Sequence, residues 1–114
     1  MDVSRGDIVL VNLDPVIGSE QGKTRPALII QNDISNKYSP ITIVAPITTK
    51  VYSKQFPTNV EIDPTNSPIK EKSTILLNQI RAIDRQRVIK NFGKISSKKL
   101  KEVDEAIRAS LGLD

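Results

Sequence analysis

The chain is divided into short runs of strand-forming residues, and each run ends at residues that favour turns. Val, Ile and Leu fill the runs, whereas Gly, Asn, Asp, Ser and Pro stand between them. The pattern predicts strands over residues 7–13, 27–31, 41–47, 59–62, 73–77, 79–83 and 88–95. Segments 73–77 and 79–83 can alternatively form one bent strand. Many short strands at this spacing are typical of a small β barrel or sandwich.

Three local features refine this pattern. Pro46 places the end of the third strand at an edge or a bulge, because proline cannot donate a ladder hydrogen bond. Gly93 predicts a bulge in the last strand. The polar connection over residues 32–40 has room for a short helical turn.

The end of the chain has helical periodicity. Apolar residues recur three or four positions apart at Leu100, Val103, Ile107 and Leu111. Either Ser96 or Ser97 can cap the start of this helix, and Gly112 is a natural terminator. A helix with one apolar stripe must pack on something, and here only the strands are present. The expected fold class is therefore mainly β with a C-terminal helix.

Composition restricts the classes of function. The 114 residues are enough for one domain, 1–114, that can fold unaided. The absence of Cys and His excludes disulfides, a thiolate nucleophile and the usual zinc sites. No run approaches membrane-spanning length and no signal peptide is evident, so the expected location is cytoplasmic. The net charge of +4 favours a polyanion only modestly, and Lys98, Lys99 and Lys101 are read as a solvated helix face.

A polar loop over residues 18–26 separates the first two predicted strands. Its Ser19, Glu20 and Gln21 supply a hydroxyl, a carboxylate and an amide. Arg25 ends the loop and is biased to an extended backbone because Pro26 follows it. This combination aims a permanently charged, planar donor from the start of a strand.

Without histidine or cysteine, few side chains can take part in chemistry. One reaction suits this inventory, namely cleavage of RNA by its own 2′-hydroxyl, in which the protein only aligns the nucleophile and stabilises charge on phosphorus. An arginine such as Arg25 and a hydroxyl such as that of Thr48 can do this. The plainer interpretation is that Arg25 forms a surface ion pair and that Thr48 and Thr49 cap the local backbone.

Several ordered blocks resemble the MazF/PemK family of toxin endoribonucleases. They are Arg5-Gly6-Asp7, Gly18-Ser19-Glu20-Gln21-Gly22 with Arg25-Pro26, Gln31-Asn32-Asp33, Gln79-Ile80-Arg81 and Ile83-Asp84. The resemblance implies an SH3-like small β barrel, a homodimer, and cofactor-free, metal-independent cleavage of single-stranded mRNA. It also implies 2′,3′-cyclic phosphate and 5′-hydroxyl ends, and an antitoxin whose acidic tail occupies the RNA site.

The same resemblance implies roles for individual residues. Arg25 matches the catalytic arginine, and Thr48, at the end of the third strand, matches the catalytic threonine. The general base stays open, with Glu20 the nearest carboxylate in sequence. The Kid branch of the family has an Arg-x-Asp pair just before the residue that matches Gln79. This chain has Leu76 and Asn78 there, so that acid–base pair is absent.

Reading the RNA sequence needs hydrogen bonds to base edges and contacts to base faces. The candidates are Ile17, Ser19, Glu20, Gln21, Thr49, Asn78 and Gln79. Tyr52 and Phe56 are the aromatic residues best placed to help, whereas Phe92 is expected in the core.

Two alternatives remain at the level of sequence. A gyrase poison of the CcdB type resembles the same fold, but such poisons carry a terminal tryptophan-containing motif and this chain ends Leu111-Gly112-Leu113-Asp114. A non-catalytic RNA-binding barrel would bind RNA without releasing a cyclic phosphate.

Overall fold

The structure is a computed structural model, and it describes residues 1–15, 17–20 and 22–113. Strands span Asp7–Asn12 (β1), Thr24–Ile29 (β2), Ile41–Thr48 (β3), Asn59–Ile62 (β4), Ser73–Leu76 (β5), Arg81–Asp84 (β6) and Val88–Lys94 (β7). Helices span Asp33–Tyr38 (α1) and Ser97–Leu111 (α2), with short 3-10 turns at Leu77–Gln79 (η1) and Arg85–Arg87 (η2). The predicted class, mainly β with a C-terminal helix, is confirmed. Neither helix in the described ranges is long and apolar enough to cross a membrane.

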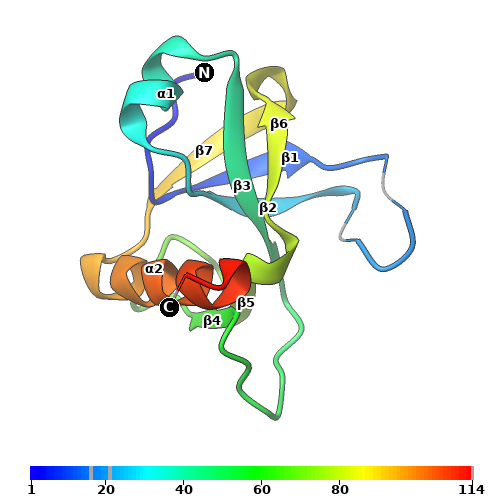
Figure 1. Ribbon diagram of the computed structural model, residues 1–114, viewed down its shortest axis with the longest axis vertical. Helices are drawn as coiled ribbons and strands as arrows, with labels where there is room; N and C mark the ends of the chain where they lie inside the picture. Colours follow the sequence, from blue (N-terminus) through cyan, green and yellow to red (C-terminus); the bar gives the residue numbers. More distant parts are fainter. Residues whose placement is uncertain (16, 21, 114) are drawn as a thin grey trace.

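The central strand is β3, which runs through the middle of the molecule (Figure 1). The antiparallel order is β4-β5-β3-β2-β1-β7, and β6 pairs with the first half of β3. Along one edge of β3, pairing with β6 ends at Val44 and pairing with β5 begins at Ile47. Pro46 lies in this break, so its missing N–H costs little there. The sheet is bent and barrel-like rather than a closed ring.

Most predicted strands are present with small shifts at their ends. β2 begins at Thr24 instead of residue 27, because Thr24 and Arg25 already pair with β1. Residues 73–83 form two strands, because η1 separates β5 from β6 and the two pair with different parts of β3. The bent-strand alternative is therefore wrong.

The predicted bulge in β7 is confirmed. Ile8 of β1 pairs with Gly93, whereas the next residue, Val9, pairs with Asn91. Phe92 is thus the extra residue, and Gly93 takes a φ of +109° that a side chain would disfavour.

The core has two parts, because alternate residues of β1 and β2 point to opposite faces of the sheet. One part lies inside the bend of the sheet and contains Val9, Val11, Leu13, Ala27, Ile29, Val44, Ile83 and Val88. The other lies between the sheet and α2 and includes Ile8, Leu28, Ile47, Val60, Ile75, Leu77, Val103 and Ala106. Figure 1 shows α2 beside β4 and β5, as the apolar stripe predicts.

The ends of α2 decide between the two predicted caps. Ser96 is the cap, since its hydroxyl accepts a hydrogen bond from the backbone N–H of Lys99 at 3.2 Å. Gly112 ends the helix with a left-handed φ of 70°. The predicted apolar stripe stops short, because Leu111 is 55% exposed.

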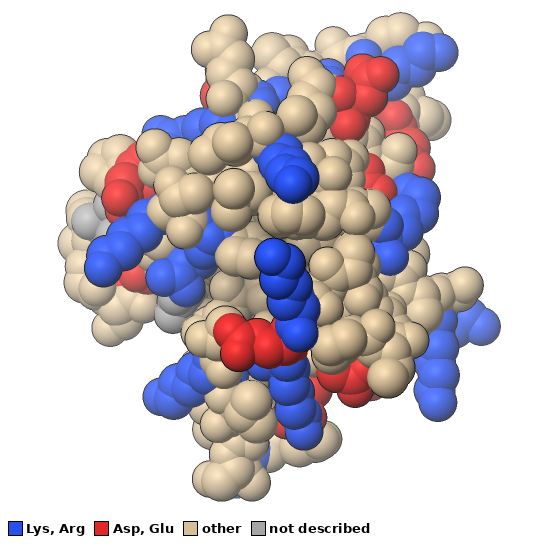
Figure 2. Space-filling model, turned by 180° about the vertical axis from the view of Figure 1, so that it is seen from behind, with Lys and Arg blue, Asp and Glu red and all other residues tan. Residues whose placement is uncertain are grey.

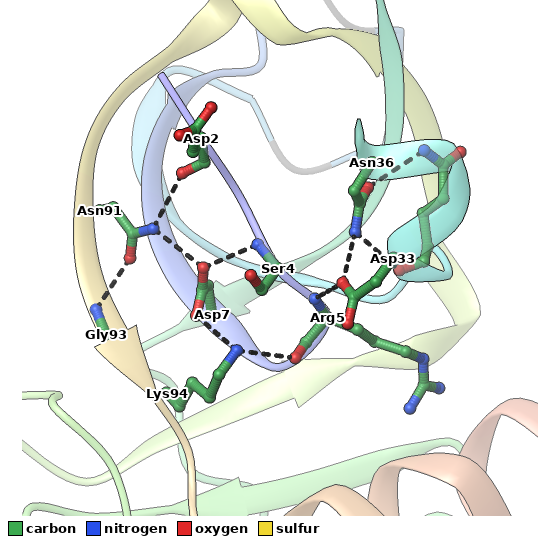
Figure 3. A network of polar contacts seen from close by, with 10 residues as sticks. Asp2, Ser4, Arg5, Asp7, Asp33, Asn36, Asn91, Gly93 and Lys94 are labelled. Carbon is green, nitrogen blue, oxygen red and sulfur yellow. Dashed lines mark hydrogen bonds and ion pairs between the residues drawn. The ribbon is translucent and has the colours of Figure 1, made fainter. Parts of the chain in front are cut away.

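Asp7 is the centre of a polar network near the N-terminus (Figure 3). The Asp7 residue is only 6% exposed. Its carboxylate accepts hydrogen bonds from the Ser4 backbone N–H at 2.8 Å and from Asn91 Nδ2 at 2.9 Å. Lys94 Nζ lies 3.2 Å from its other oxygen. These contacts tie the start of β1 to β7.

Arg5 connects this network to both helices. Its backbone N–H donates to Asp33 of α1 at 2.7 Å, and its Nη2 pairs with Asp104 of α2 at 2.7 Å. The hydrogen bond from the Arg5 backbone lowers the pKa of the Asp33 carboxyl. The Arg5-Gly6-Asp7 block therefore has a structural role, with Gly6 turning the chain at a φ of +95°.

Candidate functional site

Arg25 is the second residue of β2, at the base of the β1–β2 loop. Its backbone pairs with Val11, so the start of the strand holds it in place. Its Nε donates to the Gly22 carbonyl at 2.7 Å, and the residue is partly buried. The extended position predicted from Pro26 is confirmed, and the Nε bond orients the guanidinium plane against the loop.

Thr48 is the last residue of β3 and is partly buried. Its hydroxyl oxygen accepts a hydrogen bond from the backbone N–H of Lys50 at 3.2 Å. The side chain thus caps the backbone locally, and its own O–H remains a donor for a further oxygen.

The register between β2 and β3 relates these two residues. Ala27 pairs with Pro46. Arg25 precedes Ala27 by two positions and Thr48 follows Pro46 by two. Because side chains alternate along strands and paired residues share a face, Arg25 and Thr48 lie on the same face at the same end of this strand pair.

The row of side chains on this face continues across the sheet. Thr48 pairs directly with Thr74 of β5, and Thr74 pairs with Glu61 of β4. The row therefore begins at Arg25 and Thr48 and ends at the edge strand β4.

A cavity of about 390 Å³ gathers three of the residues predicted to contact RNA. Its lining consists of Glu20, Pro46, Asn78, Gln79, Ile80 and Arg81. Pro46 belongs to the face that carries Arg25 and Thr48, so the cavity and these two residues share a face of the sheet, although neither residue lines the cavity. The β1–β2 loop and η1, which are far apart in sequence, meet here.

The other predicted loop residues lie further out. Ile17 is 84% exposed, and its backbone N–H donates to the Glu20 carboxylate at 2.7 Å. Glu20 therefore also closes its own loop. Ser19 is exposed, and Gln21 lies outside the described residues.

Arg81 was not among the residues predicted for this site. Its Nη1 donates to the Leu13 carbonyl at 2.9 Å, at the base of the β1–β2 loop, and Arg81 also lines the cavity. It adds a positive charge that is held by backbone contact. In the sequence, only the Gln79-Ile80-Arg81 block pointed to Arg81. Its contact with the base of the β1–β2 loop becomes visible only when the structure brings the Leu13 carbonyl within reach.

The family comparison agrees with this arrangement over almost the whole chain. The family described as "PemK-like, MazF-like toxin of type II toxin-antitoxin system" matches residues 4–111. The chain belongs to this family.

Individual relatives of this MazF-like toxin span its full length. The chain is 47% identical over 113 residues to "Endoribonuclease EndoA" of Bacillus subtilis (strain 168). The aligned region covers 99% of this chain and 97% of the relative. The "Mycobacterium tuberculosis toxin MazF-mt6" is 25% identical with a TM-score of 0.79, covering 95% and 98% of the two chains. A mycobacterial "Endoribonuclease in complex with its cognate antitoxin" has the same fold, with a TM-score of 0.81 at 19% identity over 98% and 97%.

The MazF-like toxin has a second, more apolar cavity of about 300 Å³. Thr48 and Thr49 line it together with Pro26, Ile47, Ile69 and Phe92. Phe92 was expected in the core; it packs against the core while also facing this cavity, with Lys90 Nζ 5.3 Å from its ring centroid. Thr48 and Thr49 therefore line this second cavity and not the cavity of Glu20, Asn78 and Gln79.

One face of the molecule carries side chains of both charges. Figure 2 shows Lys and Arg side chains spread over one face, with Asp and Glu among them. No group of three or more carboxylates that could hold a metal ion occurs within residues 1–15, 17–20 and 22–113.

Proposed function

We propose that the protein is an endoribonuclease toxin that cleaves single-stranded mRNA at a short sequence without a metal ion. The observation that carries this proposal is that Arg25 and Thr48 lie on one face of the sheet, which they share with Pro46 of the cavity of Glu20, Asn78 and Gln79. The family and the name of the 47% identical relative support the same activity.

In the proposed reaction, the 2′-oxygen of a ribose attacks the adjacent phosphorus. The bond from phosphorus to the 5′-oxygen of the next nucleotide breaks, which leaves a 2′,3′-cyclic phosphate and, after proton transfer, a 5′-hydroxyl. The Arg25 guanidinium stabilises the charge of the phosphorane or protonates the leaving oxygen, and the Thr48 hydroxyl donates to a phosphate oxygen. An ordinary arginine stays protonated, so the proton of the 2′-hydroxyl needs another acceptor.

Glu20 is the carboxylate that lines the cavity, and a Glu20→Gln variant tests it as this acceptor. If Glu20 removes the proton, the variant loses cleavage while retaining RNA binding. If Glu20 only closes its loop through the Ile17 N–H, the glutamine oxygen preserves that bond and most of the activity.

The RNA-contacting residues in this proposal are Ile17, Ser19, Glu20, Gln21, Thr49, Asn78 and Gln79. The amides of Asn78 and Gln79 suit the hydrogen-bonding edges of unpaired bases, because an amide both donates and accepts. Exposed Ile17 offers an aliphatic surface for a base face.

The proposal includes a single-domain, cytoplasmic toxin that works as a homodimer and is neutralised by a cognate antitoxin. One structural neighbour is a toxin bound to its antitoxin, which supports this part. An acidic antitoxin tail would compete with RNA for the cations Arg25 and Arg81.

The direct test is to incubate the purified protein with a defined RNA in EDTA and to map the new ends. Cleavage with 5′-hydroxyl and cyclic phosphate ends is the expected result. RNA binding without cleavage would favour a non-catalytic barrel, and inhibition of gyrase without any RNA cleavage would favour a gyrase poison.

A further inference from the structure

We propose that the β3–β4 loop forms an accessory site in which the Phe56 ring stacks on a base of the RNA, next to the cut. This inference rests on the proposed function and extends it. It adds a second region of RNA contact beyond the cavity of Glu20, Asn78 and Gln79.

Two aromatic rings in this loop hold each other in a fixed arrangement. Tyr52 and Phe56 meet edge to face, with ring centroids 6.0 Å apart and an interplanar angle of 90°. Lys50 Nζ lies 4.9 Å from the centroid of the Tyr52 ring. Phe56 nevertheless stays 44% exposed, so an apolar ring is kept at the surface.

A hollow of about 110 Å³ adjoins the rings. Lys54, Lys99, Gln55 and Asn59 contribute cations and amides to its lining. The two acidic residues of the lining are paired: Glu61 lies 3.4 Å from Lys72, and Glu102 lies 3.2 Å from Lys99. Neither Lys50 nor Lys54 takes part in an ion pair within the described part of the chain.

The loop is pinned to β5 and η1 near both ends. The Thr74 hydroxyl donates to the Lys50 carbonyl at 2.9 Å. At the other end, the Asn59 backbone N–H donates to the Phe56 carbonyl at 3.0 Å, and the Leu77 backbone N–H donates to the Thr58 carbonyl at 2.9 Å. Because the backbone is already ordered, less conformational entropy is lost when a ligand stacks on the ring.

The hollow lies one strand away from Thr48 of the proposed cleavage site. Thr74 lines the hollow and pairs directly with Thr48. Neighbouring strands are about 5 Å apart, so a strand of RNA held at Thr48 reaches the hollow within a short distance along the same face.

The chemistry of the hollow favours a nucleotide. An exposed ring gives a base a face to stack on, and the surrounding lysines match the phosphate attached to that base. Sequence-tolerant stacking of this kind adds affinity without adding specificity.

The test uses the absence of tryptophan from the chain. In a Phe56→Trp variant, the single indole reports stacking through its fluorescence. The probe is a short RNA spanning the mapped cut, with a 2′-deoxy nucleotide at the attacked position so that it binds without cleavage. The matched control is Tyr38→Trp: Tyr38 is 76% exposed, has Lys37 Nζ at 5.4 Å from its ring, and lies on α1, at the opposite end of the molecule in Figure 1.

We expect RNA to quench the Phe56→Trp emission and leave the Tyr38→Trp emission unchanged. Phe56→Leu should weaken binding of an RNA that extends beyond the cut about fivefold or more, whereas Phe56→Tyr should preserve it. An RNA that ends at the cut should bind both variants like the unaltered protein.

Unchanged emission of the Phe56→Trp variant while labelled RNA is bound would overturn the accessory site and leave the proposed function intact. Quenching by a polyglutamate peptide and not by RNA would also overturn it, in favour of an acidic protein partner. If the unaltered protein neither binds nor cuts RNA, both the proposed function and the accessory site are wrong.

Discussion

Thr48 of β3 lies directly across from Thr74 of β5, and both side chains form hydrogen bonds with the backbone of Lys50. The Lys50 N–H donates to the Thr48 hydroxyl at 3.2 Å, and the Thr74 hydroxyl donates to the Lys50 carbonyl at 2.9 Å. This pair fixes the point where β3 ends and the β3–β4 loop begins. The Thr48 hydroxyl is therefore held in position before any substrate arrives, on the face that also carries Arg25.

Removing either proposed catalytic group should slow cleavage strongly. Arg25→Ala and Thr48→Ala should each lower kcat about a hundredfold to a thousandfold, because each removes a preorganised donor to developing charge. Arg25→Lys should not restore the rate, since an ammonium lacks the planar fork. Initial rates on a defined RNA at saturating concentration measure this effect. Arg108→Ala, which changes an exposed arginine on α2, serves as the control and should cut normally.

Altering the cavity should change recognition more than chemistry. Asn78 is exposed and lines the cavity with Glu20 and Gln79. Asn78→Ala removes hydrogen bonds to a base edge, so KM should rise by roughly twofold to tenfold with little change in kcat. Sequencing of the cleaved ends should show a relaxed preference at one position. The same change at exposed Gln86 of η2 should leave both KM and the cut pattern unaltered.

Local patterns were sufficient for most of the fold. Runs of Val, Ile and Leu between turn residues located the strands, and the spacing of Leu100, Val103 and Ile107 located α2. These signals depend on neighbours within a few positions. They could not separate Ser96 from Ser97 as the helix cap, because the chain entering α2 decides which hydroxyl reaches the backbone.

The candidate site depended on contacts between distant segments. The residue inventory named Arg25 and Thr48 and the resemblance assigned their catalytic roles, but their common face follows from the pairing of Ala27 with Pro46. The pairing register of two strands cannot be predicted from composition. Arg81 was missed for the same reason, since its role depends on the Leu13 carbonyl lying within reach.

The Asp7 network should contribute to stability and not to catalysis. Asp7→Ala should lower the free energy of unfolding by about 1.5–3 kcal/mol, because it removes hydrogen bonds to a charged acceptor and leaves the Ser4 N–H without its partner. Lys94→Met should cost about 1 kcal/mol or less, since the Lys94 side chain is 58% exposed. Denaturant titrations of the three proteins provide the comparison. Equal losses from both variants would contradict this assignment.

The lowered pKa of Asp33 predicts a stability difference that depends on pH. The Arg5 backbone hydrogen bond favours the ionised Asp33 carboxylate in the folded state. A carboxyl whose folded pKa is lowered adds stability above its ordinary value of 3.8, and this contribution is lost as pH falls through the lower folded pKa. The unaltered protein should exceed Asp33→Asn in stability at neutral pH, and the gap should close in strong acid. A gap that is constant from neutral pH to below pH 3 would rule out this linkage.

The cap of α2 allows a matched comparison of two neighbouring serines. The Ser96 hydroxyl accepts the Lys99 N–H, so Ser96→Ala should lower the free energy of unfolding by about 1 kcal/mol. Ser97 is the exposed first residue of the helix, where alanine has the higher helix propensity, so Ser97→Ala should be neutral or slightly stabilising. Thermal unfolding of both variants measures the difference. Since α2 covers the core cluster of Val103 and Ala106 and lies away from Arg25, the rate of RNA cleavage at a permissive temperature should be the same in both.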